Sequence, residues 1–175
     1  MSRAFVKEND LEHAGIDIPE RPVSNYPNYV TPGGLKQLET EADELEQERA
    51  VLKNLQGNKP GQALVSEDPQ VRQKIAVIDR DLRYIAARLS SAILVDNASH
   101  SPEVILFGAN VIVEDEDGIE HAFNIVGEDE ADIAKNKVSY LSPIAKALIG
   151  RKVGDTVEWQ RPIGNTQLTI IKITF

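Results

Sequence analysis

The chain has 175 residues, 41% of them apolar, which predicts at least one globular domain with a hydrophobic core. Its formal net charge of −9, from 28 acidic and 19 basic residues, argues against free duplex DNA as the main partner, because phosphate binding requires clustered Lys and Arg. The absence of cysteine excludes disulfides, thiolate metal sites and cysteine nucleophiles.

Residues 1–29 are expected to form a leader rather than a helix or a strand. They begin with the charged stretch MSRAFVKENDLEHAG, which is not typical of a secretory signal, and no later stretch approaches the roughly 18 apolar residues of a membrane span. We therefore expect a cytoplasmic protein without a membrane partner. Three prolines disfavour helix in the leader, at Pro19, Pro22 and Pro27. The leader is predicted to be a partly ordered arm, and Tyr26 and Tyr29 are candidates to anchor it on a neighbouring surface.

Residues 30–95 are expected to form two helices. Thr31 followed by Pro32 is a favourable helix start, because a capping hydroxyl precedes proline at the first helical position. In the first helix, apolar residues recur three or four positions apart at Leu35, Leu38, Ala42 and Leu45, and the next one, Leu52, follows after Arg49 takes the intervening inward position. In the second, the alternating spacing of a coiled-coil seam places on one face Val71, Ile75, Ile78, Leu82, Ile85 and Leu89. The segment between them, QGNKPGQALVSEDP, contains helix breakers, so the pattern predicts an antiparallel coiled-coil hairpin with arms of about 35 Å.

The two predicted helices differ in charge. The first is rich in glutamate, and Arg49 interrupts its apolar spacing. The second carries basic residues at Arg72, Lys74, Arg80, Arg83 and Arg88. Two interpretations stay open: charge pairs between the arms fix their antiparallel register, or the second arm presents a modest basic stripe to RNA.

Residues 96–175 are expected to form an α+β domain. The stretch VILFGANVIVED is strand-like, and DEDG forms a turn before HAFNIVG, so this pair is predicted to be a β-hairpin. Ser142 and Pro143 begin a short helix, IAKALI, which Gly150 ends. Two more strand-like stretches follow, TVEWQ and TQLTIIKITF. This order predicts an antiparallel sheet with one short helix on a face.

The residues that carry chemistry are few, and we expect neither a catalytic residue nor a metal site. His13, His100 and His121 lie far apart in the sequence, without the spacing of a helical metal site. The acidic run 114–118 lacks the alternating ligands of a calcium loop, which favours a solvated turn. For the acidic run 128–132 two interpretations remain open: cation ligands, or a charged loop or helix start.

Several stretches resemble the Gre family of bacterial transcript cleavage factors. IVGEDEAD (125–132) and SPIAKALIGRKVGD (142–155) are similar to the C-terminal domain of that family. RDLRYIAARLSSAILVD (80–96) resembles its second coiled-coil arm, closest to the GreB branch, and YVTPGGLKQL (29–38) resembles the start of its first arm. The leader matches neither the short GreA nor the short GreB pattern, and is similar to an extended Gre-like subgroup. The resemblance implies a coiled-coil hairpin over 30–95 and an FKBP-like, polymerase-docking domain over 96–175.

The resemblance also implies a partner. Gre factors dock their C-terminal domain at the rim of the secondary channel of bacterial RNA polymerase, and the hairpin reaches towards the active centre. The corresponding docking residues here are Leu141, Ser142, Pro143 and Ile144. The family commonly has Asp or Asn where this chain has Leu141. We expect a monomer that meets RNA or DNA only within the polymerase complex. It would have no cofactor of its own, and any magnesium would be shared with the polymerase.

The hairpin tip departs from the family pattern. Gre factors carry G-D-x-x-E-N-A there, and its two acids help to hold the second catalytic magnesium and a water, because magnesium binds hard oxygen ligands. Counting back from RDLRYIAARL without gaps, these acids fall on Gly61 and Leu64, whose side chains have no oxygen. The nearest acids are Glu67 and Asp68, whose alternative role is to complement the dipole of the second helix.

Three hypotheses follow for the function. The first is a regulator that occupies the secondary channel and modulates transcription without promoting transcript cleavage. The second is an active cleavage factor in which Glu67 and Asp68 replace the usual acids from a remodelled tip. The third is a peptidyl-prolyl isomerase, which would follow only from the FKBP-like fold; an aromatic content of 5% argues against the aromatic-lined pocket that such enzymes need.

Overall fold

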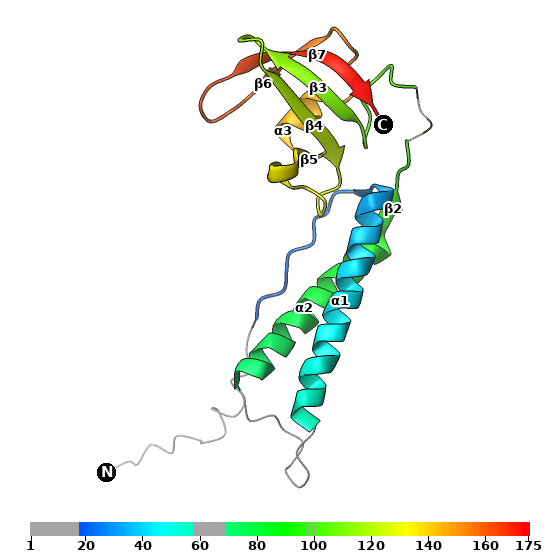
Figure 1. The fold of residues 1–175 in the computed structure, drawn as a ribbon, viewed down its shortest axis with the longest axis vertical. Coiled ribbons are helices and arrows are strands. Elements are labelled where there is room, and N and C mark those ends of the chain that lie inside the picture. The colour runs from blue at the N-terminus through cyan, green and yellow to red at the C-terminus, as the bar shows by residue number, and fades with distance from the viewer. Residues whose placement is uncertain (1–17, 58–68, 98, 100) are drawn as a thin grey trace, which may run out of the picture. The chain divides into compact units, whose positions relative to one another are not determined.

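The computed structural model of the chain describes residues 18–57, 69–97, 99 and 101–175 (Figure 1). These residues form two compact units. Among the described residues, we call 18–23, 41–57 and 69–87 the hairpin unit, and 24–40, 88–97, 99 and 101–175 the sheet unit. In the parts of the chain that the structure describes, no helix is both long and apolar enough to cross a membrane.

The hairpin unit is built from the greater part of two long antiparallel helices, α1 (Pro32–Gly57) and α2 (Pro69–Ser91) (Figure 1). The start of α1, up to Thr40, and the end of α2, from Arg88, belong to the sheet unit. As expected, Thr31 caps α1: its hydroxyl accepts a hydrogen bond of 3.0 Å from the Gly34 N–H. Two of the predicted seam residues, Ile78 and Ile85, are buried at 5% and 1% exposure. The other four in α2 are half-buried. The periodicity therefore identified the inward face of α2 correctly.

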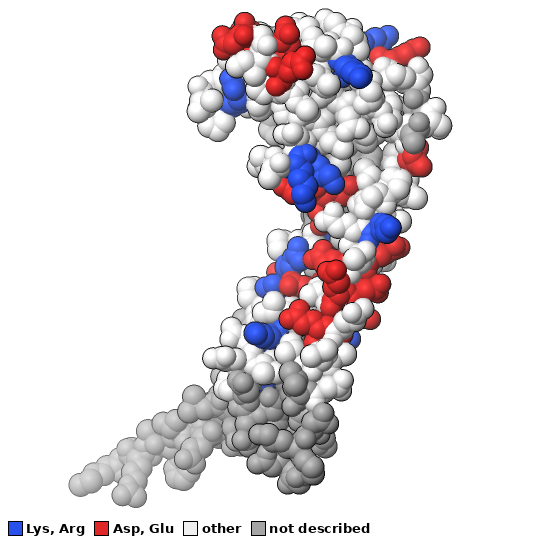
Figure 2. All heavy atoms as spheres, viewed as in Figure 1, with Lys and Arg blue, Asp and Glu red and all other residues white. Residues whose placement is uncertain are grey.

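Arg49 makes a charge pair between the arms, but with the base on α1 and the acid on α2, the reverse of an acidic first arm paired with a basic second arm. Its guanidinium donates a hydrogen bond of 3.0 Å to Asp79 of α2. Arg49 takes an inward position in the apolar repeat of α1, where a long side chain can reach across to the opposite helix. Figure 2 shows acidic side chains gathered over α1 and basic side chains beside them over α2 on the visible face.

The core of the sheet unit is a five-stranded sheet in the order β5-β4-β3-β7-β6. The strands are β3 (Asn110–Asp115), β4 (Glu120–Val126), β5 (Lys137–Ser139), β6 (Thr156–Trp159) and β7 (Thr166–Thr174). Neighbouring strands run antiparallel except β4 and β5, which run parallel. The α+β prediction is thus confirmed, with one parallel pair that the sequence did not indicate.

One short helix packs against this sheet, as predicted. Helix α3 (Pro143–Leu148) adds Ile144, Ala145 and Leu148 to a hydrophobic core that the inward side chains of the strands complete. On the strands, inward and outward residues alternate, as in Val111 and Val113 of β3, so one face of each strand is buried. A three-residue 3₁₀ helix, η2 (Ile133–Lys135), lies between β4 and β5.

Two differences from the sequence-based expectation concern strands. Within the predicted strand VILFGANVIVED, only the part from Asn110 onward is a strand, because Gly108 adopts a positive φ of 85° and turns the chain before it. The end of the predicted leader also forms a strand, β1 (Asn28–Val30), which pairs in parallel with β2 (Ala92–Leu94). This pairing joins residues far apart in the sequence, where no local pattern indicates it.

Candidate functional site

The predicted docking residues form the connection from β5 into α3. Ser142 is the N-cap of α3, and its hydroxyl accepts a hydrogen bond of 3.2 Å from the Ala145 N–H, which confirms the predicted capping role. Pro143 follows at the start of the helix and is exposed, and Leu141 is half-buried. The segment 141–143 therefore presents side chains on a backbone that the helix cap holds in place.

Ile144 behaves differently from its three neighbours. Its side chain is only 7% exposed and belongs to the hydrophobic core. It therefore supports the segment from the interior and does not offer a surface to a partner. A charged residue at an exposed docking position would leave the fold intact. Because Ile144 is buried, a charged residue at this position is expected to destabilise the fold.

An aromatic cluster lies directly before the segment 141–143. The rings of Tyr29 and Tyr140 meet edge to face at 5.4 Å between centroids, and each lies 5.9 Å from the ring of Phe107. The Tyr140 hydroxyl donates a hydrogen bond to the Pro27 carbonyl. Burial, with a further contribution from the negative charge of Glu128, raises the pKa of Tyr140, so this hydroxyl keeps its proton and stays a donor. Tyr29 thus anchors the end of the leader, as expected.

Two acids of the run 128–130, Glu128 and Asp129, contact a buried arginine. Arg88 of α2 is 1% exposed, and its Nε donates a hydrogen bond of 2.6 Å to Asp129. Its Nη2 donates a bond of 2.6 Å to the Asn28 side-chain oxygen and lies 3.4 Å from a Glu128 oxygen. The Asn28 amide donates back to the Arg88 carbonyl at 2.7 Å. We call these four residues the Arg88 network.

The third acid of the run holds the start of α1. One carboxylate oxygen of Glu130 accepts a hydrogen bond of 2.9 Å from the Thr31 N–H, and the other accepts one from the Thr31 hydroxyl. A Cβ on Gly34 would lie 1.9 Å from the Glu130 carboxyl carbon, so a larger residue there would displace this carboxylate. Glu130 therefore adds a second cap to α1.

For the acidic run 128–132, the structure favours the charged-loop interpretation over cation ligands. Glu128, Asp129 and Glu130 are used as described above, and Asp132 caps η2 by accepting from the Ala134 N–H at 3.1 Å. A hydrogen bond from Lys135 lowers the pKa of Asp132. Within the described ranges, no three His, Asp or Glu residues are grouped as a metal ion would require.

The acidic run 114–118 is a β-hairpin turn, as predicted. A carboxylate oxygen of Asp115 accepts hydrogen bonds from the N–H groups of Asp117 at 3.0 Å and Ile119 at 2.9 Å. The other oxygen lies 2.9 Å from Nε2 of His121, and this hydrogen bond lowers the pKa of Asp115. The carboxylate thus organises the turn.

From sequence, Arg88 was grouped with the basic residues of the second arm, for pairing with the first arm or for a basic stripe, and its buried role was missed. One signal was available: it lies three positions after Ile85, so it falls on the apolar side of α2. The tip positions Gly61, Leu64, Glu67 and Asp68 lie outside the described residues, so their roles stay predictions.

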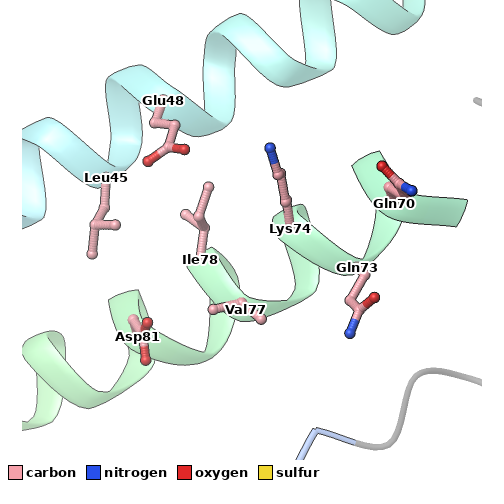
Figure 3. A pocket seen from close by; sticks show the side chains of 8 residues that line it. All are labelled: Leu45, Glu48, Gln70, Gln73, Lys74, Val77, Ile78 and Asp81. Atoms are coloured by element: carbon pink, nitrogen blue, oxygen red, sulfur yellow. The ribbon is translucent and has the colours of Figure 1, made fainter. Parts of the chain in front are cut away.

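The hairpin unit contains a groove of about 620 Å³ between its two helices (Figure 3). Leu45 of α1 and Ile78 of α2 project towards each other there, and Glu48 and Lys74 extend into the same space. The remaining lining residues are Gln70, Gln73, Val77 and Asp81. This mixture of apolar and oppositely charged side chains forms an open seam, without the convergent polar groups of an active site.

Comparisons with known proteins agree on one group of relatives. The model of the C-terminal domain of the transcription elongation factors GreA and GreB matches residues 99–175. Transcription elongation factor GreB of Neisseria meningitidis serogroup B is 33% identical over 153 residues, which are 85% of this chain and 94% of that protein. Transcription elongation factor GreA of Nitratidesulfovibrio vulgaris is 32% identical over 146 residues, which are 81% and 90% of the two chains. Among solved structures, GreA factor homolog 1 of Thermus thermophilus is similar, with 27% identity, a TM-score of 0.40, and coverage of 86% of this chain and 100% of that one.

Proposed function

Since the chain belongs to the GreA/GreB family of transcription elongation factors, we propose that it binds bacterial RNA polymerase at the secondary channel and regulates elongation without stimulating transcript cleavage. The segment 141–143 is the proposed contact with the polymerase. The hairpin unit is the part that enters the channel. In this proposal the protein is not itself an enzyme, and it acts as a monomer.

The observation that supports docking through segment 141–143 is that its backbone is fixed at the start of α3. The Ser142 cap fixes the backbone, Ile144 is anchored in the core, and Pro143 is exposed to solvent. A contact surface on a fixed backbone loses little conformational entropy when a partner binds. The same surface can therefore bind the polymerase without rearranging the sheet unit.

Nucleic acid enters this proposal only through the polymerase. The net charge of −9 opposes direct binding to phosphates. The described basic residues of the hairpin unit are also partly used in ion pairs, such as Arg49 with Asp79 and Arg21 with Asp81. We propose that the protein has no cofactor of its own, and that any magnesium near its tip belongs to the polymerase.

Docking is tested with Leu141→Lys, which places a charge on the proposed contact surface. We expect the dissociation constant for RNA polymerase to rise about tenfold or more, because a contact of this kind contributes over 1 kcal/mol at an interface. Ile163→Lys is the control, since Ile163 is 85% exposed on the connection between β6 and β7. Equal affinity of folded Leu141→Lys and the natural protein would exclude the proposed docking segment.

The absence of cleavage is tested on a backtracked elongation complex, with an intact Gre factor as the positive control. The positions that match the family's acids, Gly61 and Leu64, offer no side-chain oxygens to a magnesium ion. We expect no stimulation by the natural protein, and competition with the intact Gre factor for the channel. The double variant Glu67→Ala/Asp68→Ala should leave cleavage at background. Vigorous cleavage that disappears in this variant would show instead that these two acids act from a remodelled tip.

A further inference from the structure

The leader carries an exposed aromatic side chain close to the segment 141–143. Tyr26 is 60% exposed and lies at a bend of the chain, where its N–H donates a hydrogen bond of 3.3 Å to the Ser24 hydroxyl. Every other aromatic side chain in the described part of the chain is buried or half-buried. Tyrosine is one of the residue types enriched among the hot spots of protein interfaces.

The backbone next to Tyr26 is fixed within the sheet unit. Pro27 accepts the hydrogen bond of the Tyr140 hydroxyl, and Asn28 is 4% exposed within the Arg88 network. The strand β1 then pairs with β2. Although Tyr26 belongs to the leader, its Cα is therefore only one residue, about 3.8 Å, from an anchored position.

The same hydrogen bond brings the leader to the proposed docking segment. Tyr140 immediately precedes Leu141, and Pro27 immediately follows Tyr26. The bond between Tyr140 and Pro27 therefore joins the residue before the docking segment to the residue after Tyr26. All of these residues belong to the sheet unit, so the neighbourhood is a property of one compact body.

We propose that Tyr26 and Pro27 extend the docking surface of segment 141–143, so that RNA polymerase contacts a composite surface made by the leader and the β5–α3 connection. The inference rests on the proposed function and assigns a role to the leader. A tyrosine suits such a contact because its ring is large and rigid, and its hydroxyl can reach a polar group at the edge of the interface. A second copy of this chain is the other conceivable occupant, but the continuity with the docking segment favours the polymerase.

The test compares polymerase affinity of the full chain in four forms: natural, Tyr26→Ala, Ile163→Ala and Leu141→Lys. Tyr26 and Ile163 are both well exposed and both in the sheet unit. We therefore expect neither substitution to disturb the packing of the core, which near-ultraviolet circular dichroism monitors. We expect Tyr26→Ala to raise the dissociation constant about tenfold, as for an aromatic hot spot, and Ile163→Ala to leave it within about twofold.

The outcomes separate this inference from the proposed function. If Leu141→Lys weakens binding and Tyr26→Ala changes it by less than about twofold, the composite surface is wrong and the docking segment stands. The composite surface is equally wrong if Tyr26→Ala abolishes self-association of the protein while leaving polymerase affinity unchanged. If neither Leu141→Lys nor Tyr26→Ala changes the affinity, or the natural protein does not bind, the proposed docking itself fails.

Discussion

An Arg88→Ala variant is expected to lose about 3–5 kcal/mol of its free energy of unfolding, as when one partner of a buried ion pair is removed. Arg88 is 1% exposed and donates to Asp129 and Asn28 at 2.6 Å each. Alanine would leave the carboxylate of Asp129 without its buried cation. It would also leave the Asn28 side-chain oxygen, itself deeply buried, without this donor. The loss is therefore much larger than for an exposed arginine.

The protein provides its own probe and control for this experiment. Trp159 is the single tryptophan of the chain and lies in the sheet unit, so its fluorescence during denaturation reports on that unit. Arg72→Ala removes an exposed arginine of the same helix and should change the stability by less than about 0.5 kcal/mol. Arg88→Lys should fall between the two, because lysine keeps the charge but loses the planar donor geometry. Equal denaturation midpoints for Arg88→Ala and Arg72→Ala would mean that the Arg88 network does not stabilise the fold.

The second large effect is expected for Ile144→Asp, which should destabilise the sheet unit by at least about 4 kcal/mol. The side chain of Ile144 is 7% exposed and packs in the core with Ala145 and Leu148. Aspartate would remove its apolar contacts and place a carboxyl group where no partner has been arranged for it. Much of the variant should then be unfolded at ordinary temperature, because typical domains are stable by only about 5–15 kcal/mol.

Ile133→Asp is a matched control for this substitution. Ile133 is 91% exposed on η2, so the same chemical change there should barely affect the denaturation midpoint. The comparison matters for function, because loss of polymerase binding by Ile144→Asp would report unfolding and not a lost contact. A well-folded Ile144→Asp protein with a near-natural midpoint would contradict the assignment of Ile144 to the core.

The two helices were predictable from sequence because their signals are local. The spacing of apolar residues identified Ile78 and Ile85 as inward positions, and Thr31 with Pro32 marked the start of α1. The same holds for α3, where Ser142 and Pro143 mark the N-terminus. In each case the information lies within one or two turns of the chain, which is the range of periodicity and capping.

The parts that were missed depend on residues far apart in the sequence. The strand β1 exists because the end of the leader meets Ala92–Leu94. The buried hydrogen-bonding role of Arg88 arises because Asn28 and Asp129, far apart in the sequence, both accept hydrogen bonds from it. The burial of Ile144 follows from the packing of α3 on the sheet, whereas sequence alone placed it in the docking surface with residues 141–143. Local propensity does not encode such contacts, and a single sequence does not reveal them.

The second cap of α1 also has a consequence for the order in which the protein is made. Glu130, which accepts from Thr31, lies 99 residues further along the chain. At a synthesis rate of roughly 5–20 residues per second, Thr31 would leave the ribosome about 5–20 seconds before this carboxylate is available. During that interval the first turn of α1 has only its own Thr31 hydroxyl, which bonds the Gly34 N–H within the helix. The nascent chain would therefore form its local helices early. The hydrogen bonds of Thr31 to Glu130 and of Arg88 to Asp129 would form only after the acidic run has been translated.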